Sequence, residues 1–144
     1  MGTKEMTGAR LRVVIDTNVF VSAILFPGEI NRLVDLWQKG EFVFLISREI
    51  LAEYLKVLSY PKFALNRTDI RQIIEKELIP YVQIVEVKTE IEVIKNDLSD
   101  NKFLDLALDG KAQYLVSGDR HLLDVGEFHN IKIARPGDFL KLFR

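Results

Sequence analysis

The 144-residue sequence is informative first through what it lacks. It contains no cysteine, which excludes disulfide bonds and thiolate metal ligands and fits a reducing compartment. Its two histidines, His121 and His129, have no partner at ligand spacing, so the sequence does not indicate a zinc site. No apolar run approaches the roughly 18 residues of a membrane span, and residues 1–10 lack the apolar core of a signal peptide. We therefore expect a cytoplasmic protein with a flexible leader over residues 1–10.

An excess of one charge is also lacking. The chain has 20 basic and 21 acidic residues and a net charge of −1, so no overall positive field attracts nucleic acid. The eight glycines are scattered and form neither a phosphate-binding loop nor a dinucleotide fingerprint. A serine nucleophile elbow is absent as well. A nucleic-acid partner would need a local basic patch or a metal ion to manage its phosphates.

Hydrophobic residues are plentiful, at 48% of the chain, and they recur in alternating strand-like and helix-like patterns. We expect one domain over residues 11–144, because this length suits a single core. Each parallel strand needs a crossover, so the alternation predicts a three-layer α/β/α fold with a central, mainly parallel sheet of about five strands. The predicted strands are 11–15, 42–46, 82–87, 114–117 and 131–134.

The predicted helices follow from caps, apolar spacing and breakers. They are residues 19–26 (helix or ordered loop), 30–37 ended by Gly40, 48–58 capped by Ser47, one capped by Thr68 and ending before Pro80, a short one with Thr89 and Glu92 as a capping box, one from Ser99 to Gly110, and a last one from Pro136 to Phe143.

Acidic side chains follow the predicted strands at one edge of the sheet. Asp16 ends the first strand, and Asp119 follows the fourth. Asp100 starts the helix that leads into the fourth strand. Since the carboxyl ends of parallel strands share one edge, we expect these three carboxylates there, where ligands bind in such folds. Close carboxylates raise one another's pKa unless a cation neutralises them, and their hard oxygen atoms suit Mg²⁺ or Mn²⁺.

Each acid also has a structural alternative. Asp16 and Asp119 suit turns, and Asp100 suits a helix N-cap, as does Asp97 just upstream. Glu53 lies just outside the apolar stripe of its helix, so it either reaches the sheet edge or faces water and pairs with Lys56. We expect Asp105, five residues past Asp100, to point away from the site.

Four ordered segments resemble the PIN-domain family. They are VVIDTNVFVS at residues 13–22, Glu53 in the helix after the second strand, DLSDNKFL at residues 97–104 with Ala107, and LVSGD at residues 115–119. The chain is most similar to single-domain toxin components of prokaryotic toxin–antitoxin pairs, the VapC group. Ser117 replaces a common threonine but keeps the hydroxyl group. Leu98 and Ser99 stand where relatives often have a proline and an acid.

The resemblance implies a Mg²⁺- or Mn²⁺-dependent ribonuclease, often a homodimer, that acts on RNA and is silenced by a small antitoxin protein. It implies Asp16 and Asp100 as central metal ligands, with Glu53 and Asp119 completing the catalytic site. Thr17, Asn18 and Ser117 would then orient the ligands or a phosphate group.

Substrate-contacting residues are harder to read from the sequence. Lys102 and Arg120 are candidates for phosphate contacts, and so are Lys62, Arg67 and His121, although each also suits an ordinary solvated surface. The aromatic candidates for stacking on bases are Phe20, Phe26, Trp37 and Phe63. Trp37 lies in an apolar stripe that favours the core or a dimer interface instead.

Two alternative functions remain open at the level of sequence. A haloacid-dehalogenase-type phosphatase also begins with an aspartate after strand one, but it needs a second aspartate two residues later, where this chain has Asn18. A non-catalytic PIN-like module would bind RNA or protein without cleavage, and loss of acids would mark it. All four candidate acids are present here.

Overall fold

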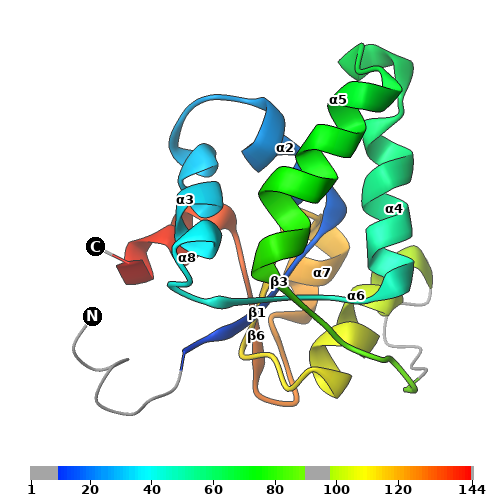
Figure 1. Cartoon of the computed structure of the whole chain (residues 1–144). Helices are drawn as coiled ribbons and strands as arrows, with labels where there is room; N and C mark the ends of the chain where they lie inside the picture. The colour runs from blue at the N-terminus through cyan, green and yellow to red at the C-terminus, as the bar shows by residue number, and fades with distance from the viewer. Residues whose placement is uncertain (1–9, 90–97, 144) are drawn as a thin grey trace.

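The computed structural model describes residues 10–89 and 98–143, the side chains of residues 98–100 excepted. A sheet lies at its centre with helices around it (Figure 1). The sheet has six strands in the order β3-β2-β1-β4-β6-β5. All neighbouring strands are parallel except β5 and β6, which form an antiparallel hairpin. The strands are β1 (Arg12–Ile15), β2 (Val43–Ile46), β3 (Val82–Ile84), β4 (Tyr114–Val116), β5 (Glu127–Phe128) and β6 (Ile131–Ala134).

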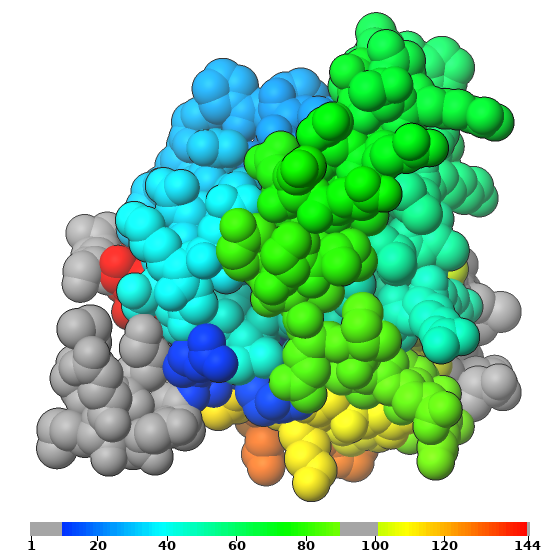
Figure 2. All heavy atoms as spheres, viewed as in Figure 1, coloured from blue at the N-terminus to red at the C-terminus, as the bar shows by residue number. Residues whose placement is uncertain are grey.

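Helices flank this sheet, which confirms the predicted α/β architecture. They are α2 (Thr17–Leu25), α3 (Arg32–Gln38), α4 (Arg48–Leu58), α5 (Arg67–Gln72), α6 (Leu98–Asp109), α7 (Arg120–Val125) and α8 (Pro136–Leu140). Shorter helical turns are Glu29–Asn31, Pro61–Phe63, Ile79–Tyr81 and Lys141–Phe143, and a π-helical segment, Ile73–Leu78, continues α5. In the space-filling view, α3 and the α5 segment, coloured cyan and green, cover most of the face toward the viewer (Figure 2).

The central position of β1 follows from its composition. Val13, Val14 and Ile15 are fully buried, as a strand covered on both faces of a sheet requires. β1 pairs with β2 on one side and β4 on the other, with Val14 opposite Leu115. The carboxyl ends of β1 and β4 therefore lie side by side, as the acid-bearing loops require.

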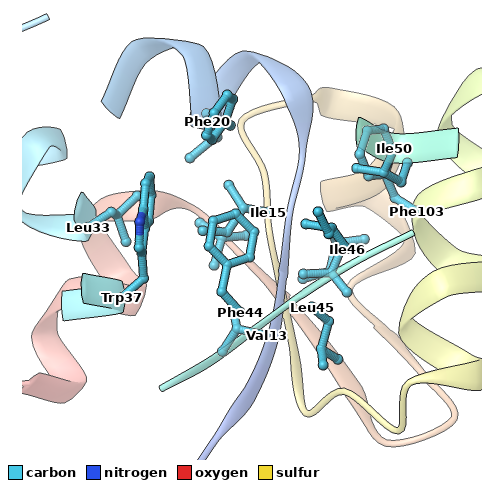
Figure 3. Packing of buried hydrophobic residues seen from close by; sticks show 14 of the residues in the cluster. Val13, Ile15, Phe20, Leu33, Trp37, Phe44, Leu45, Ile46, Ile50 and Phe103 are labelled. Carbon is cyan, nitrogen blue, oxygen red and sulfur yellow. The ribbon is translucent and has the colours of Figure 1, made fainter. Parts of the chain in front are cut away.

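Aromatic side chains fill the core beside this central strand (Figure 3). Phe20 of α2 stacks on Tyr54 of α4 with ring centroids 4.1 Å apart, and Trp37 of α3 lies 4.9 Å from Phe44 of β2. The buried rings join helices distant in sequence to the sheet, and such aromatic pairs add to the free energy gained by burial. Phe20 and Trp37 are therefore core residues and not base-stacking candidates.

Several predicted boundaries need correction. Asn66, and not Thr68, is the N-cap of α5, where Asn66 and Asp69 form a reciprocal capping box. Pro80 lies beyond the end of this helix, as predicted, but within a separate helical turn, Ile79–Tyr81. The strand β5 was not predicted, because two residues are too few to show an alternating pattern. A turn at His129 and Asn130 joins it to β6, and both turn residues have positive φ.

Other predictions hold or lie outside the described residues. Ser47 caps α4 by accepting a hydrogen bond from the Ile50 amide, and Pro136 begins α8 as expected. The helix expected at Thr89 and Glu92 cannot be placed, since residues 90–97 lie outside the described part, as do residues 1–9 of the leader. Within the described residues no helix combines the length and the apolar character needed to cross a membrane.

Candidate active site

Asp16 is the buried centre of the candidate site. It follows β1 as the N-cap of α2, and its Oδ1 accepts a hydrogen bond from the Val19 amide at 2.9 Å. Its Oδ2 accepts a second one from the hydroxyl group of Ser117. Only 5% of Asp16 is exposed. The capping alternative is thus realised by one oxygen, while the other oxygen accepts a hydrogen bond from the residue that follows strand β4.

Burial raises the pKa of the Asp16 carboxyl to about 6. The two hydrogen bonds, from Ser117 and Val19, oppose this shift, and the negative charges of Asp119 and Glu53 add to it. An ionised Asp16 is therefore costly unless a positive charge compensates it. A divalent cation would supply that charge, so the environment of Asp16 fits a metal ligand.

Asp119 and Ser117 come from the loop after β4. Ser117 is fully buried, and its Oγ accepts a hydrogen bond from the Asp119 amide at 2.9 Å. The Asp119 side chain caps α7, accepting hydrogen bonds from the amides of His121 at 2.8 Å and Leu122 at 3.4 Å. Ser117 thus links the two acids that we predicted at this edge, as a donor to Asp16 and an acceptor from Asp119.

Glu53 reaches the site from the second turn of α4. Its Oε2 accepts a hydrogen bond from the Thr17 hydroxyl group at 2.6 Å, and its Oε1 lies 2.8 Å from the ammonium nitrogen of Lys102 on α6. The alternative in which Glu53 faces water and pairs with Lys56 is therefore wrong. The physical reason is that α4 packs against α2 and α6, so Glu53 meets them at the rim of the core.

Tyr54 is a supporting residue that the sequence did not identify. Its hydroxyl group donates a hydrogen bond of 2.5 Å to the carbonyl oxygen of Ile15, the residue before Asp16. Complete burial raises the pKa of this phenol well above its ordinary value, with the charges of Asp16 and Glu53 contributing. Tyr54 stays neutral and fixes the end of β1. A tyrosine next to Glu53 in the apolar stripe was the signal that could have found it.

The remaining predicted residues are placed less completely. Asp100 is the third residue of α6, but its side chain lies outside the described part, and so does Asp97. Asn18 and Arg120 are exposed in the first turns of α2 and α7. Asp105 is buried, with 9% exposed. Among the described side chains, no three acids or histidines are grouped closely enough to hold a metal ion.

Two aromatic candidates do lie at the surface. Phe26, after α2, is 48% exposed, and its ring centroid lies 6.4 Å from that of Phe63, which precedes α5. The Lys62 ammonium group lies 5.2 Å from the centroid of the Phe63 ring. These residues combine aromatic faces with a positive charge, the composition that single-stranded nucleic acids favour.

Comparison with known proteins identifies the class of this domain. A model of the PIN domain family matches residues 12–121, most of the chain, and the chain belongs to that family. The fold is thus of the nuclease type. PIN domains are generally nucleases, and they typically use divalent metal ions.

Two relatives extend the comparison. The chain is 30% identical to the uncharacterized protein MJ1680 of Methanocaldococcus jannaschii over an alignment of 152 positions that covers 97% of this chain and 96% of the relative. It also resembles the crystal structure of PAE2754 from Pyrobaculum aerophilum, with a TM-score of 0.58 over 92% of this chain and 89% of that one. At 16% identity, the second match supports the fold alone.

Proposed function

We propose that the protein is a Mg²⁺- or Mn²⁺-dependent endoribonuclease that hydrolyses phosphodiester bonds at the carboxyl edge of its sheet. The observation that supports this most directly is Asp16. Asp16 is a buried carboxyl with a pKa raised to about 6, near the charges of Asp119 and Glu53 in a PIN domain, and this environment supports a role as a cation ligand. The haloacid-dehalogenase alternative loses its support, because family membership favours a nuclease.

The proposed metal ligands are the carboxylates of Asp16, Asp100 and Asp119, together with Glu53. They offer only oxygen atoms, which suits a hard divalent cation. When bound, such a cation lowers the pKa of a water molecule and stabilises charge on a phosphoryl oxygen. Ser117 and the Val19 amide orient Asp16, and Thr17 orients Glu53, so that the acids keep their positions before the cation arrives.

We further propose single-stranded RNA as the substrate. Lys102 and Arg120, on the helices that begin at this edge, are the candidates for phosphate contacts. Phe26 and Phe63 offer a stacking surface for unpaired bases, with Lys62 beside them. Replacing both phenylalanines with serine is expected to raise KM for single-stranded RNA while kcat changes little.

The biological role we propose is that of a toxin in a toxin–antitoxin pair, acting as a homodimer that a small antitoxin protein silences. The support is the resemblance of the sequence segments to the VapC group. Expression of the wild-type chain in a bacterial host is expected to arrest growth, whereas an Asp16→Asn variant is expected to be tolerated. Light scattering of the purified protein gives the oligomeric state.

The decisive experiment is cleavage of single-stranded RNA by purified protein with Mn²⁺, with EDTA and with the Asp16→Asn variant. Cleavage that needs both Mn²⁺ and Asp16 is the expected outcome. A matched single-stranded DNA tests the preference for RNA. Mn²⁺-independent RNA binding without cleavage would favour a non-catalytic PIN-like binding module and contradict the proposal.

A further inference from the structure

Both carboxylate oxygens of the candidate acid Glu53 are engaged, one of them by Lys102. The Lys102 ammonium nitrogen lies 2.8 Å from Oε1, and the Thr17 hydroxyl group donates to Oε2 at 2.6 Å. The side chains of Lys102 and Glu53 are only 25% and 21% exposed. Both carboxylate oxygens of Glu53 therefore have a donor, in a place where water screens charges less than it does at an open surface.

This ammonium group lies at an edge that carries several carboxylates. Burial raises the pKa of Asp16, and the negative charges of Asp119 and Glu53 add to that shift. A lysine ammonium group is a compact point charge on a flexible stem, and it can leave one carboxylate for another acceptor without disturbing its helix. A metal ion that used Oε1 of Glu53 would meet this charge directly and be repelled by it.

We infer that Lys102 is a positioning residue that holds Glu53 in the absence of metal and releases it when a divalent cation binds. The inference rests on the proposed function, because it concerns the same metal site. Lys102 and the cation compete for Glu53, so the lysine lowers the affinity of the site for the cation. Thr17 keeps Glu53 in place during the exchange, since its hydroxyl group uses the other oxygen.

Isothermal titration of the metal-free protein with Mn²⁺ tests the competition. Replacing Lys102 with methionine is expected to tighten Mn²⁺ binding by about three- to tenfold, because a partly screened competing charge is removed. The matched control is Lys56→Met, which removes the same charge from the exposed face of α4, three residues after Glu53. That variant is expected to change the Kd by less than about twofold. Unchanged or weaker Mn²⁺ binding by Lys102→Met would overturn the inference.

A double-mutant cycle separates direct competition from a general electrostatic effect. In a Glu53→Gln background, Lys102→Met should leave the Kd for Mn²⁺ nearly unchanged, because the carboxylate for which Lys102 and Mn²⁺ compete is gone. Lys102→Arg, which keeps the charge, should behave like the wild type. A tightening that persists without Glu53 would show that Lys102 acts through its charge at a distance, and the inference would be wrong.

Amine acetylation of the wild-type protein, followed by mass spectrometry, tests the release without any substitution. The ammonium group of Lys102 is expected to react slowly in EDTA and several-fold faster with Mn²⁺, whereas Lys56 should react equally in both. Labelling of Lys102 that does not rise with Mn²⁺ would contradict the release. If the wild type binds Mn²⁺ and cleaves RNA but the labelling of Lys102 does not change, this inference alone is refuted. If the wild type neither binds Mn²⁺ nor cleaves RNA, the proposed function is refuted as well.

Discussion

Two aspartates of this protein receive hydrogen bonds on both carboxylate oxygens, yet their pKa values move in opposite directions. Asp16, at the carboxyl edge of the sheet, is buried, and its pKa rises to about 6. Asp109, at the end of α6, accepts hydrogen bonds from the amides of Lys88 and Thr89 and from the Thr89 hydroxyl group. These hydrogen bonds lower its pKa.

The difference separates a carboxylate whose ionisation supports the fold from one whose ionisation the fold opposes. Asp109 has little burial to oppose its donors, so ionisation is favourable and ties residues 88 and 89 to α6. Asp16 has donors as well, but burial and two neighbouring acids outweigh them. The folded protein bears a cost at Asp16 that a bound cation would remove.

The largest expected effect concerns activity. Asp16→Asn keeps the size of the side chain but removes its charge, and is expected to lower the rate of RNA cleavage by at least about 10³-fold. The Asp109→Asn variant is expected to cleave RNA at a rate within about twofold of the wild-type rate, because Asp109 contacts residues 88 and 89 and not the candidate site acids. Cleavage assays in Mn²⁺ at equal protein concentration measure both, and an active Asp16→Asn variant would remove the basis of the comparison.

The second effect is a pH dependence of stability without metal. The pKa of Asp16 is raised from 3.8 to about 6, so the folded state binds its proton more tightly than the unfolded state. The stability that this proton contributes is complete below pH 4 and is lost as the pH rises through 6; the shift corresponds to about 3 kcal/mol at pH 7. Urea unfolding in EDTA should therefore show Asp16→Asn gaining stability over the wild type between pH 4 and pH 7. A difference independent of pH would contradict this.

The third effect is a loss of stability with the opposite sign of pH dependence. Asp109→Asn weakens the hydrogen bonds to Lys88 and Thr89 and is expected to cost about 1–2 kcal/mol at neutral pH. The pKa of Asp109 is lowered from its ordinary value of 3.8. The stability that its ionised form contributes is therefore present above pH 3.8 and is lost as the pH falls through the lowered pKa. The exposed Asp124 is a matched control, with an expected change within about 0.5 kcal/mol on replacement by asparagine. Equal losses for the two variants would show that Asp109 has no special role.

The smallest effect sharpens the comparison at Asp16 itself. Ser117→Ala removes the hydroxyl donor that opposes the raised pKa of Asp16, so the carboxyl becomes harder to ionise. Cleavage is expected to fall by about fivefold near pH 6 and less at pH 8. Ser117→Thr keeps the hydroxyl group and should retain most of the activity. A loss that is the same at both pH values would point to a packing defect.

The sequence predicted the sheet and its acid-bearing edge because both depend on local patterns. Apolar runs located five of the six strands, and the βα alternation placed Asp16 and Asp119 after neighbouring strands. It could not predict that Glu53 pairs with Lys102, 49 residues away, because that choice depends on how α4 packs against α6. The Thr68 error has a different cause: Asn66 and Thr68 are both good caps, and the spacing of Asn66 and Asp69, which forms the capping box, was the signal that favours Asn66.

The pairing of β1 with β4 also determines when the site exists during synthesis. The hydrogen bond from Ser117 to Asp16 spans 101 residues, and β4 must insert beside β1 before that bond can form. Contacts of such separation form late, because a long loop must close first. A nascent chain that has not yet emerged past Asp119 therefore carries Asp16 without its hydrogen bond from Ser117. The Asp16–Ser117 contact thus forms only after β4 is free of the ribosome.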